Sequence, residues 1–160
     1  IGDGAFSGCA LTSVELPEGV IGIGREAFSG CSGLTSMAIP SSMASIDSRA
    51  FYGCSGLTSI NVDSENEWYC SIDGVLYDKD ATELICCPGG LVLVTIPSGV
   101  TSIGDDAFCN CTSLTDAPEL NATVLGEYCY NSMFFCCTSL TKAPDLLATN
   151  LVKVSSSTIS

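Results

Sequence analysis

The sequence predicts a repeat solenoid, an array of stacked coils, and three observations support this fold class. One phrase recurs along the chain: IGDGAFSGC from Ile1, IGREAFSGC from Ile23, IDSRAFYGC from Ile46 and IGDDAFCNC from Ile103. A leucine follows each phrase, and the leucine series has spacings of 23, 23, 34, 23 and 26 residues: Leu11, Leu34, Leu57, Leu91, Leu114 and Leu140. A unit of about 23 residues is too short to enclose a core alone, so it must stack on its neighbours. We expect six coils, numbered by these leucines, over residues 1–154, and a polar tail over 155–160.

Each unit predicts one strand, one turn and a short returning strand. The pattern of Leu34, Met37 and Ile39 favours an extended segment that ends at Pro40. The run from Arg25 to Phe28 is compatible with one short helical turn, whose start suits the acidic residues found there in other units. The segment 100–103 is the second extended piece. We therefore expect parallel β-strands joined by short helical turns.

The 34-residue spacing indicates an insert of 11 extra residues. Ile85 stands six residues before Leu91, where the other units carry phenylalanine, so the surplus lies before it. Asp73-Gly74 lies between apolar pairs, which is a strong local signal for a hairpin turn. We expect a β-hairpin insert at about residues 64–83.

Composition excludes several functional classes. The net charge of −13 disfavours nucleic-acid and anionic-membrane partners, which need a basic surface. The absence of histidine excludes Ser-His-Asp and Cys-His catalysis and histidine-containing zinc sites. No apolar run of about 18 residues is present, so we expect no membrane insertion. The residues from Ile1 onward do not form a basic n-region, so we expect no signal peptide in this chain. Coil 1 lacks a preceding strand, so we expect the chain to be a piece of a longer array.

Eleven cysteines suggest either covalent links or small buried residues. Five of them occupy the same place in five units: Cys9, Cys31, Cys54, Cys111 and Cys137. Stacked in register, their Cβ vectors run side by side instead of converging, which favours buried thiols over a disulfide ladder or a metal column. The other six form no C-x-x-C pair, so we predict no metal and no cofactor.

The acidic runs around Glu65 and Asp78 suggest a hard-cation site or solvated loop charge. The spacing of a calcium loop is absent, which favours loop charge. An acidic-pair hydrolase using Glu65 and Glu67 stays open as a minor alternative, because a short solenoid does not suggest a cleft.

The surface that remains is the outward face of the stacked strands, and extended solenoid sheets are commonly binding surfaces. Its candidate ligand-binding residues are Thr12, Glu15, Thr35, Thr58, Asn61, Thr95, Asp116 and Lys142. Trp68, Tyr69 and Tyr77 lie on the insert. They either pack the hairpin onto the array or offer aromatic anchors to a partner.

The segments IGREAFSGCSGLTSMAIP and IDSRAFYGCSGLTSI resemble the BspA-like leucine-rich repeats, and so do SIDGVLYDKDATELICCPGG and LTKAPDLLAT. The resemblance covers about residues 1–151. It implies a leucine-rich-repeat right-handed horseshoe and an extracellular or cell-surface protein, with no catalytic motif to carry over. Pro88 at a stacked-cysteine position and Asp63 in place of the strand-ending proline depart from the pattern near the insert.

These inferences predict a non-enzymatic cell-surface or secreted binding or adhesion module that recognises a protein or a glycan through the strand face. The alternative is a structural spacer within a larger surface protein. Neither reading predicts the ligand or the oligomeric state.

Overall fold

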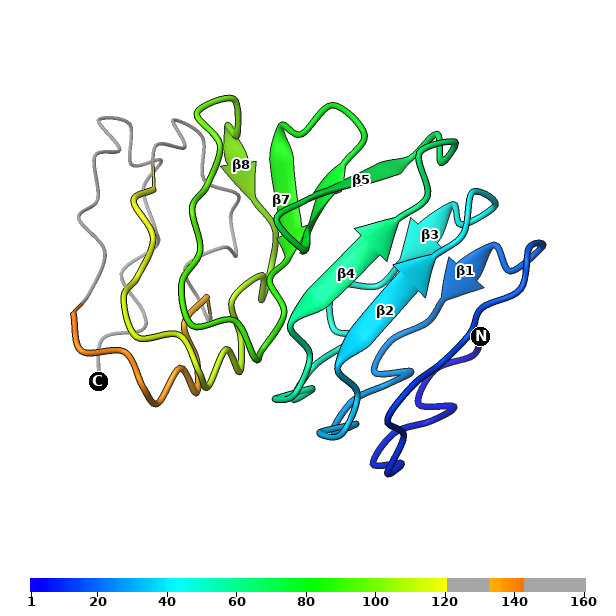
Figure 1. The fold of residues 1–160 in the computed structure, drawn as a ribbon, viewed down its shortest axis with the longest axis horizontal. Helices are drawn as coiled ribbons and strands as arrows, with labels where there is room; N and C mark the ends of the chain where they lie inside the picture. Colours follow the sequence, from blue (N-terminus) through cyan, green and yellow to red (C-terminus); the bar gives the residue numbers. More distant parts are fainter. Residues whose placement is uncertain (121–132, 143–160) are drawn as a thin grey trace, which may run out of the picture.

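Short parallel strands stack along the array in two columns (Figure 1). The computed structural model describes residues 1–120 and 133–142. The paired strands are β1 (Gly22–Ile23) with β3 (Ser45–Ile46), and β2 (Ser36–Ile39) with β4 (Ser59–Val62). Ile23 lies opposite Ile46 and Met37 lies opposite Ile60, so each residue pairs with the one 23 positions along the chain. The repeat length therefore sets the strand register.

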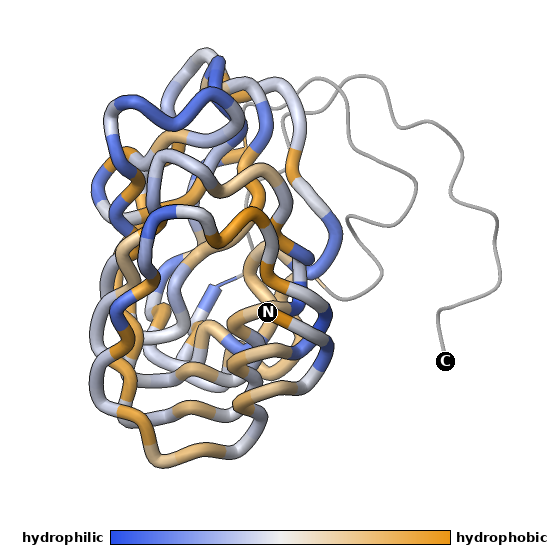
Figure 2. The backbone as a smooth tube through the Cα atoms, turned by 90° about the vertical axis from the view of Figure 1, so that its right-hand side faces the viewer, coloured by the Kyte–Doolittle hydropathy of each residue, from blue (hydrophilic) through white to orange (hydrophobic). Residues whose placement is uncertain are grey.

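Alternation along β2 explains why this segment forms a strand. Met37 and Ile39 are buried while Ser36 and Ala38 are exposed, as expected for a half-buried strand with a side-chain period of two. Leu34 and Leu57, which precede the paired strands, are completely buried. Seen nearly along the stack, the coils lie one behind another, so each apolar interior is covered by the next (Figure 2).

The prediction of short helical turns is wrong for the described residues, which contain strands and turns but no helix. In coil 2, Ala27 and Cys31 donate their N–H groups to carbonyls three residues earlier, whereas Phe28 and Gly30 donate to the next coil. Glu26 and Gly30 adopt positive φ angles of 56° and 72°, which a continuous α-helix does not allow. Alternate amides therefore bond between coils, and the turn becomes part of the stack.

Phenylalanine rings stack on the turn side of the array. The ring centroids of Phe6 and Phe28 lie 5.3 Å apart, and those of Phe28 and Phe51 lie 5.8 Å apart. Phe108 and Phe134 repeat the arrangement at 5.2 Å in coils 5 and 6. The repeated phenylalanine thus places one ring on the next, with Phe28 and Phe108 fully buried.

The predicted hairpin is present. Its strands are β5 (Tyr69–Ile72) and β6 (Val75–Asp78), and the sheet continues through β7 (Glu83–Cys86) to β8 (Ser102–Ile103). Asp73 and Gly74 both have positive φ angles, 51° and 81°, as a two-residue type I′ turn requires. β5 and β6 are antiparallel, and β7 pairs in parallel with β8 to resume the stack.

β6 divides the interior into two separate apolar cores. Leu76 packs into the core of coils 1–3, whereas Val75 and Tyr77 pack into the core of coils 4–6. Successive side chains of a strand point to opposite faces, so one strand serves both cores. The array therefore consists of two halves joined by the hairpin.

Coil 4 departs from the expected alignment. The Cys87 N–H donates to the Ala107 carbonyl, just as the Phe28 N–H donates to Ala50. The position of the stacked phenylalanine is therefore taken by Cys87, not by Ile85 as the leucine spacing predicted. Between Leu84 and Cys87 lie two residues, whereas Ile103 and Phe108 are separated by four, so the turn of coil 4 is shorter than its neighbours.

The ten described cysteines are free thiols. Four of the predicted column are buried, and each thiol contacts a carbonyl oxygen of the preceding coil: Cys31, Cys54, Cys111 and Cys137. The Sγ atoms of Cys54 and Cys137 lie 3.1 and 2.9 Å from the carbonyl oxygens of Phe28 and Phe108. Burial raises the pKa of Cys54 to about 12, which favours the thiol that donates this bond. Cys9, in coil 1, is exposed.

Candidate binding surface

The threonine that follows the repeat leucine forms a ladder of hydrogen bonds between coils at the start of the strand face. Thr58 donates its backbone N–H and its hydroxyl to the Thr35 carbonyl, at 2.9 and 3.1 Å. Thr115 makes the same two bonds to the Val92 carbonyl at 3.1 and 3.4 Å, and Thr141 makes them to Thr115 at 3.2 and 3.4 Å. The threonine after the repeat leucine therefore holds adjacent coils together through both its N–H and its hydroxyl.

All eight predicted strand-face residues are exposed, but they do not form one continuous sheet. The paired sheet on this face consists of β2 and β4, and the hairpin turn covers the next edge. Gly74 accepts a hydrogen bond from the Ile60 N–H at 2.8 Å, and a Cβ added at Gly74 would lie 3.1 Å from Ser59.

The hairpin thus divides the predicted surface. Coils 1–3 contribute Thr12, Glu15, Thr35, Thr58 and Asn61, whereas coils 4–6 contribute Thr95, Asp116 and Lys142. Ala38 lies opposite Asn61, so the outward positions on β2 and β4 are aligned.

Sequence reasoning missed two members of the threonine ladder. Thr115 and Thr141 occupy the ladder position in coils 5 and 6, one residue before the predicted Asp116 and Lys142. The signal was the Leu-Thr pair, which also occurs at Leu114 and Leu140. In coil 4 the position belongs to exposed Val92, and Thr95 lies three residues further on.

The three predicted aromatic anchors have different environments. Trp68 is 44% exposed and is available to a partner. Tyr69 is partly buried against the first core, and its hydroxyl accepts the Ile46 N–H at 3.0 Å. Tyr77 is completely buried and cannot act as a surface anchor, because its ring fills the second core. Its hydroxyl has no hydrogen-bond partner, and burial raises its pKa to about 12.

The insert is held by one buried asparagine. The Asn66 amide donates to the carbonyls of Pro40 and Met43, both at 2.9 Å. Its oxygen accepts the N–H groups of Trp68 and Tyr69 at 2.9 and 2.8 Å. Asn66 therefore pairs with backbone carbonyls of coil 2 at the point where the insert leaves the array.

The acidic residues of the insert cap loops. Asp63 accepts the Glu65 N–H, and the Asp78 carboxylate accepts the N–H groups of Thr82 and Glu83. Glu65 and Glu67, the candidates for an acidic pair, are exposed on the loop before β5. Among residues 1–120 and 133–142, no group of three or more histidine, cysteine, aspartate or glutamate residues is arranged to hold a metal ion.

Comparison with protein families gives a match over most of the chain. The model of the BspA type leucine rich repeat region matches residues 1–71 and 87–158, in six copies. The chain belongs to the BspA-type leucine-rich repeat family. The unmatched residues 72–86 contain β6, the returning strand of the hairpin, and β7, the strand that resumes the stack. Repeats of this family are typically non-catalytic.

Solved structures share the fold. A leucine-rich repeat protein from Eubacterium ventriosum is 30% identical with a TM-score of 0.71, over 78% of this chain and 34% of that one. The pneumococcal vaccine antigen PcpA is 23% identical with a TM-score of 0.64, over 83% of this chain and 40% of that one. The chain thus spans about a third of the first and two fifths of the second.

Curated proteins gave no match. Within the described ranges, no helix has the length and apolar character needed to cross a membrane.

Proposed function

We propose that this chain is a non-enzymatic binding module, displayed outside the cell, that recognises a protein or glycan through the strand face of coils 1–3. The single observation that carries the proposal is the alignment of exposed polar side chains on β2, β4 and the threonine ladder. A surface of this kind suits an extended partner, because the hydroxyl groups of Thr35 and Ser36 recur one coil later at Thr58 and Ser59.

Two further observations support this location. Trp68 is the exposed aromatic residue of the insert, and exposed tryptophan is enriched at sites that dominate binding energy. PcpA, which shares the fold, is described as a pneumococcal vaccine antigen.

The test is binding of the purified chain to panels of extracellular matrix proteins and glycans. Substituting Thr35 and Thr58 by lysine should lower affinity for any captured ligand by about tenfold or more, because two long cations would replace small side chains at the centre of the face. Thr138→Lys is the matched control, since Thr138 is exposed on the turn side. Equal binding by both variants, or no saturable binding, would favour a spacer role.

A further inference from the structure

The array carries a groove on the strand column opposite the proposed binding face. The groove has a volume of about 390 Å³ and lies between coils 3 and 5, above the short coil 4. Its lining includes Ile46 and Ser48 from coil 3, Glu83 and Ile85 from coil 4, and Ser102 and Asp105 from coil 5. Ligand sites are commonly clefts of about 300–1,000 Å³.

The groove follows from the shortened turn of coil 4. Two residues separate Leu84 from Cys87, whereas four separate Ile46 from Phe51 in coil 3. Coil 4 therefore lacks the outward loop that its neighbours have, and the walls on both sides rise above it.

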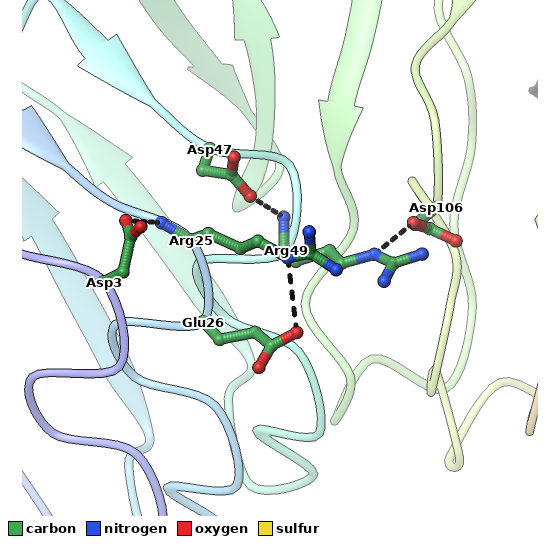
Figure 3. A network of polar contacts seen from close by, with 6 residues as sticks. All are labelled: Asp3, Arg25, Glu26, Asp47, Arg49 and Asp106. Atoms are coloured by element: carbon green, nitrogen blue, oxygen red, sulfur yellow. Dashed lines mark hydrogen bonds and ion pairs between the residues drawn. The ribbon is translucent and has the colours of Figure 1, made fainter.

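An ion pair joins the two walls. The Nε atom of Arg49 lies 2.6 Å from Oδ2 of Asp106, across 57 residues of sequence (Figure 3). The two residues directly follow Ser48 and Asp105 of the groove lining. The pair links the two walls and engages the Arg49 guanidinium beside the groove.

Two carboxylates on the lining have no cation of their own. No hydrogen bond or ion pair engages the side chains of Glu83 and Asp105 within the described part of the chain. Burial raises the pKa of Glu83, and the charges of Asp78 and Asp105 raise it further. The isoleucines on the floor and walls supply apolar surface beside these charges.

We propose that this intercoil groove binds a lysine or arginine side chain presented by an extended segment of a partner protein. The aliphatic stem would lie on Ile85 and the cationic head between Glu83 and Asp105, where the Ser48 and Ser102 hydroxyls accept further hydrogen bonds. The charge of the site is complementary to a basic segment, and two carboxylates are fewer than the oxygen ligands that a divalent cation requires. This site is independent of the proposed strand-face function.

The experiment titrates the ¹⁵N-labelled full chain with acetyl-Ala-Arg-Ala-amide and acetyl-Ala-Lys-Ala-amide, and follows amide chemical shifts. We expect saturable shifts at Ser48, Glu83, Ser102 and Asp105 with both peptides. The uncharged norleucine peptide should give none, because the cation is the recognised group.

Variants separate a specific site from general attraction to an acidic protein. Glu83→Gln with Asp105→Asn should weaken binding by about tenfold, the scale of two solvent-exposed charge pairs, since both carboxylates are exposed. Glu65→Gln with Glu67→Gln removes the same charge from the exposed loop before β5 and should leave affinity unchanged.

Three results would overturn the proposal. They are an equal loss in both double variants, saturable shifts confined to β2 and β4, and equal affinity for free argininamide, which would assign the groove to a small amine instead of a protein segment.

Discussion

Coils 1–3 and coils 4–6 use the same repeat phrase but build different structures. In the first half, β2 and β4 pair at the repeat spacing, and three phenylalanine rings stack in succession. In the second half, the hairpin occupies the strand edge, and Cys87 replaces the ring that would continue the column. A repeat therefore specifies strand pairing only where an unbroken neighbour lies beside it, since each coil depends on the next for its hydrogen bonds and its core.

The two halves should lose stability separately when their cores are damaged. Phe28→Ala and Phe108→Ala each remove a fully buried ring and should cost about 3–5 kcal/mol. Because β6 separates the cores, hydrogen exchange should quicken around Ile23 and Met37 in the first variant and around Ile103 and Leu114 in the second. Uniform loss of protection in either variant would contradict two separate cores.

The Asn66→Ala substitution should destabilise the first half where it joins the insert. Asn66→Ala removes the amide partner of the Met43 carbonyl and of the Trp68 and Tyr69 N–H groups, while the Pro40 carbonyl keeps its bond from the Met43 N–H. We expect a loss of about 3 kcal/mol in urea unfolding. The matched control is Asn61→Ala, whose side chain is exposed on β4 and should change stability by less than about 0.5 kcal/mol. Similar costs for the two would show that the buried network contributes little.

Two tyrosines of the hairpin should respond in opposite directions to loss of the hydroxyl. Tyr77→Phe removes a buried group without a partner and should stabilise the second half by about 1 kcal/mol. Tyr69→Phe leaves the Ile46 N–H without its acceptor and should destabilise the first half by a similar amount. Thermal unfolding measures both, and a loss of stability in Tyr77→Phe would indicate that the hydroxyl has a bonded water.

The ion pair between the halves should contribute less. Arg49→Met keeps the aliphatic stem and removes the charge, and we expect a loss of about 0.5–1 kcal/mol that shrinks at high salt. A double-mutant cycle with Asp106→Asn isolates the pair. Zero coupling at low salt would mean that the pair does not hold the groove walls together.

The smallest effect should be a dependence on pH at Glu83. Its pKa is raised in the folded protein, so stability is greatest below the unfolded pKa and falls as pH rises through the folded pKa. Glu83→Gln should therefore unfold at a higher temperature than the parent at about pH 7, and at the same temperature at about pH 3. A variant less stable at neutral pH would show that the carboxylate has a favourable partner.

Much of the fold could be predicted from particular residues of the sequence. The leucine spacing predicted the 23-residue register of Met37 with Ile60, and Asp73-Gly74 predicted the hairpin turn. The helical turn was wrong because a single unit does not reveal that Phe28 and Gly30 donate to the neighbouring coil. The alignment of Ile85 with phenylalanine failed because counting back from Leu91 assumes an equal turn length, and coil 4 is short on both sides of Cys87.

The candidate surfaces were predictable only in part. Exposure of Thr35, Thr58 and Asn61 follows from strand alternation, and the structure bears it out. The division of the face by Gly74 depends on where the hairpin folds back, which no local pattern specifies. The groove required three coils and the shortened turn to be known together, since Ser48, Glu83 and Asp105 lie far apart in sequence.

The hydrogen bonds between coils give the stack a direction. Turn amides such as Phe28 N–H donate toward the following coil, whereas the thiol of Cys54 and the hydroxyl of Thr58 donate toward the preceding one. The two end surfaces of any such stack are therefore chemically unlike. Two stacks meeting through their first coils would set acceptors against acceptors along the turns, and through their last coils donors against donors, so head-to-tail association along this axis is favoured.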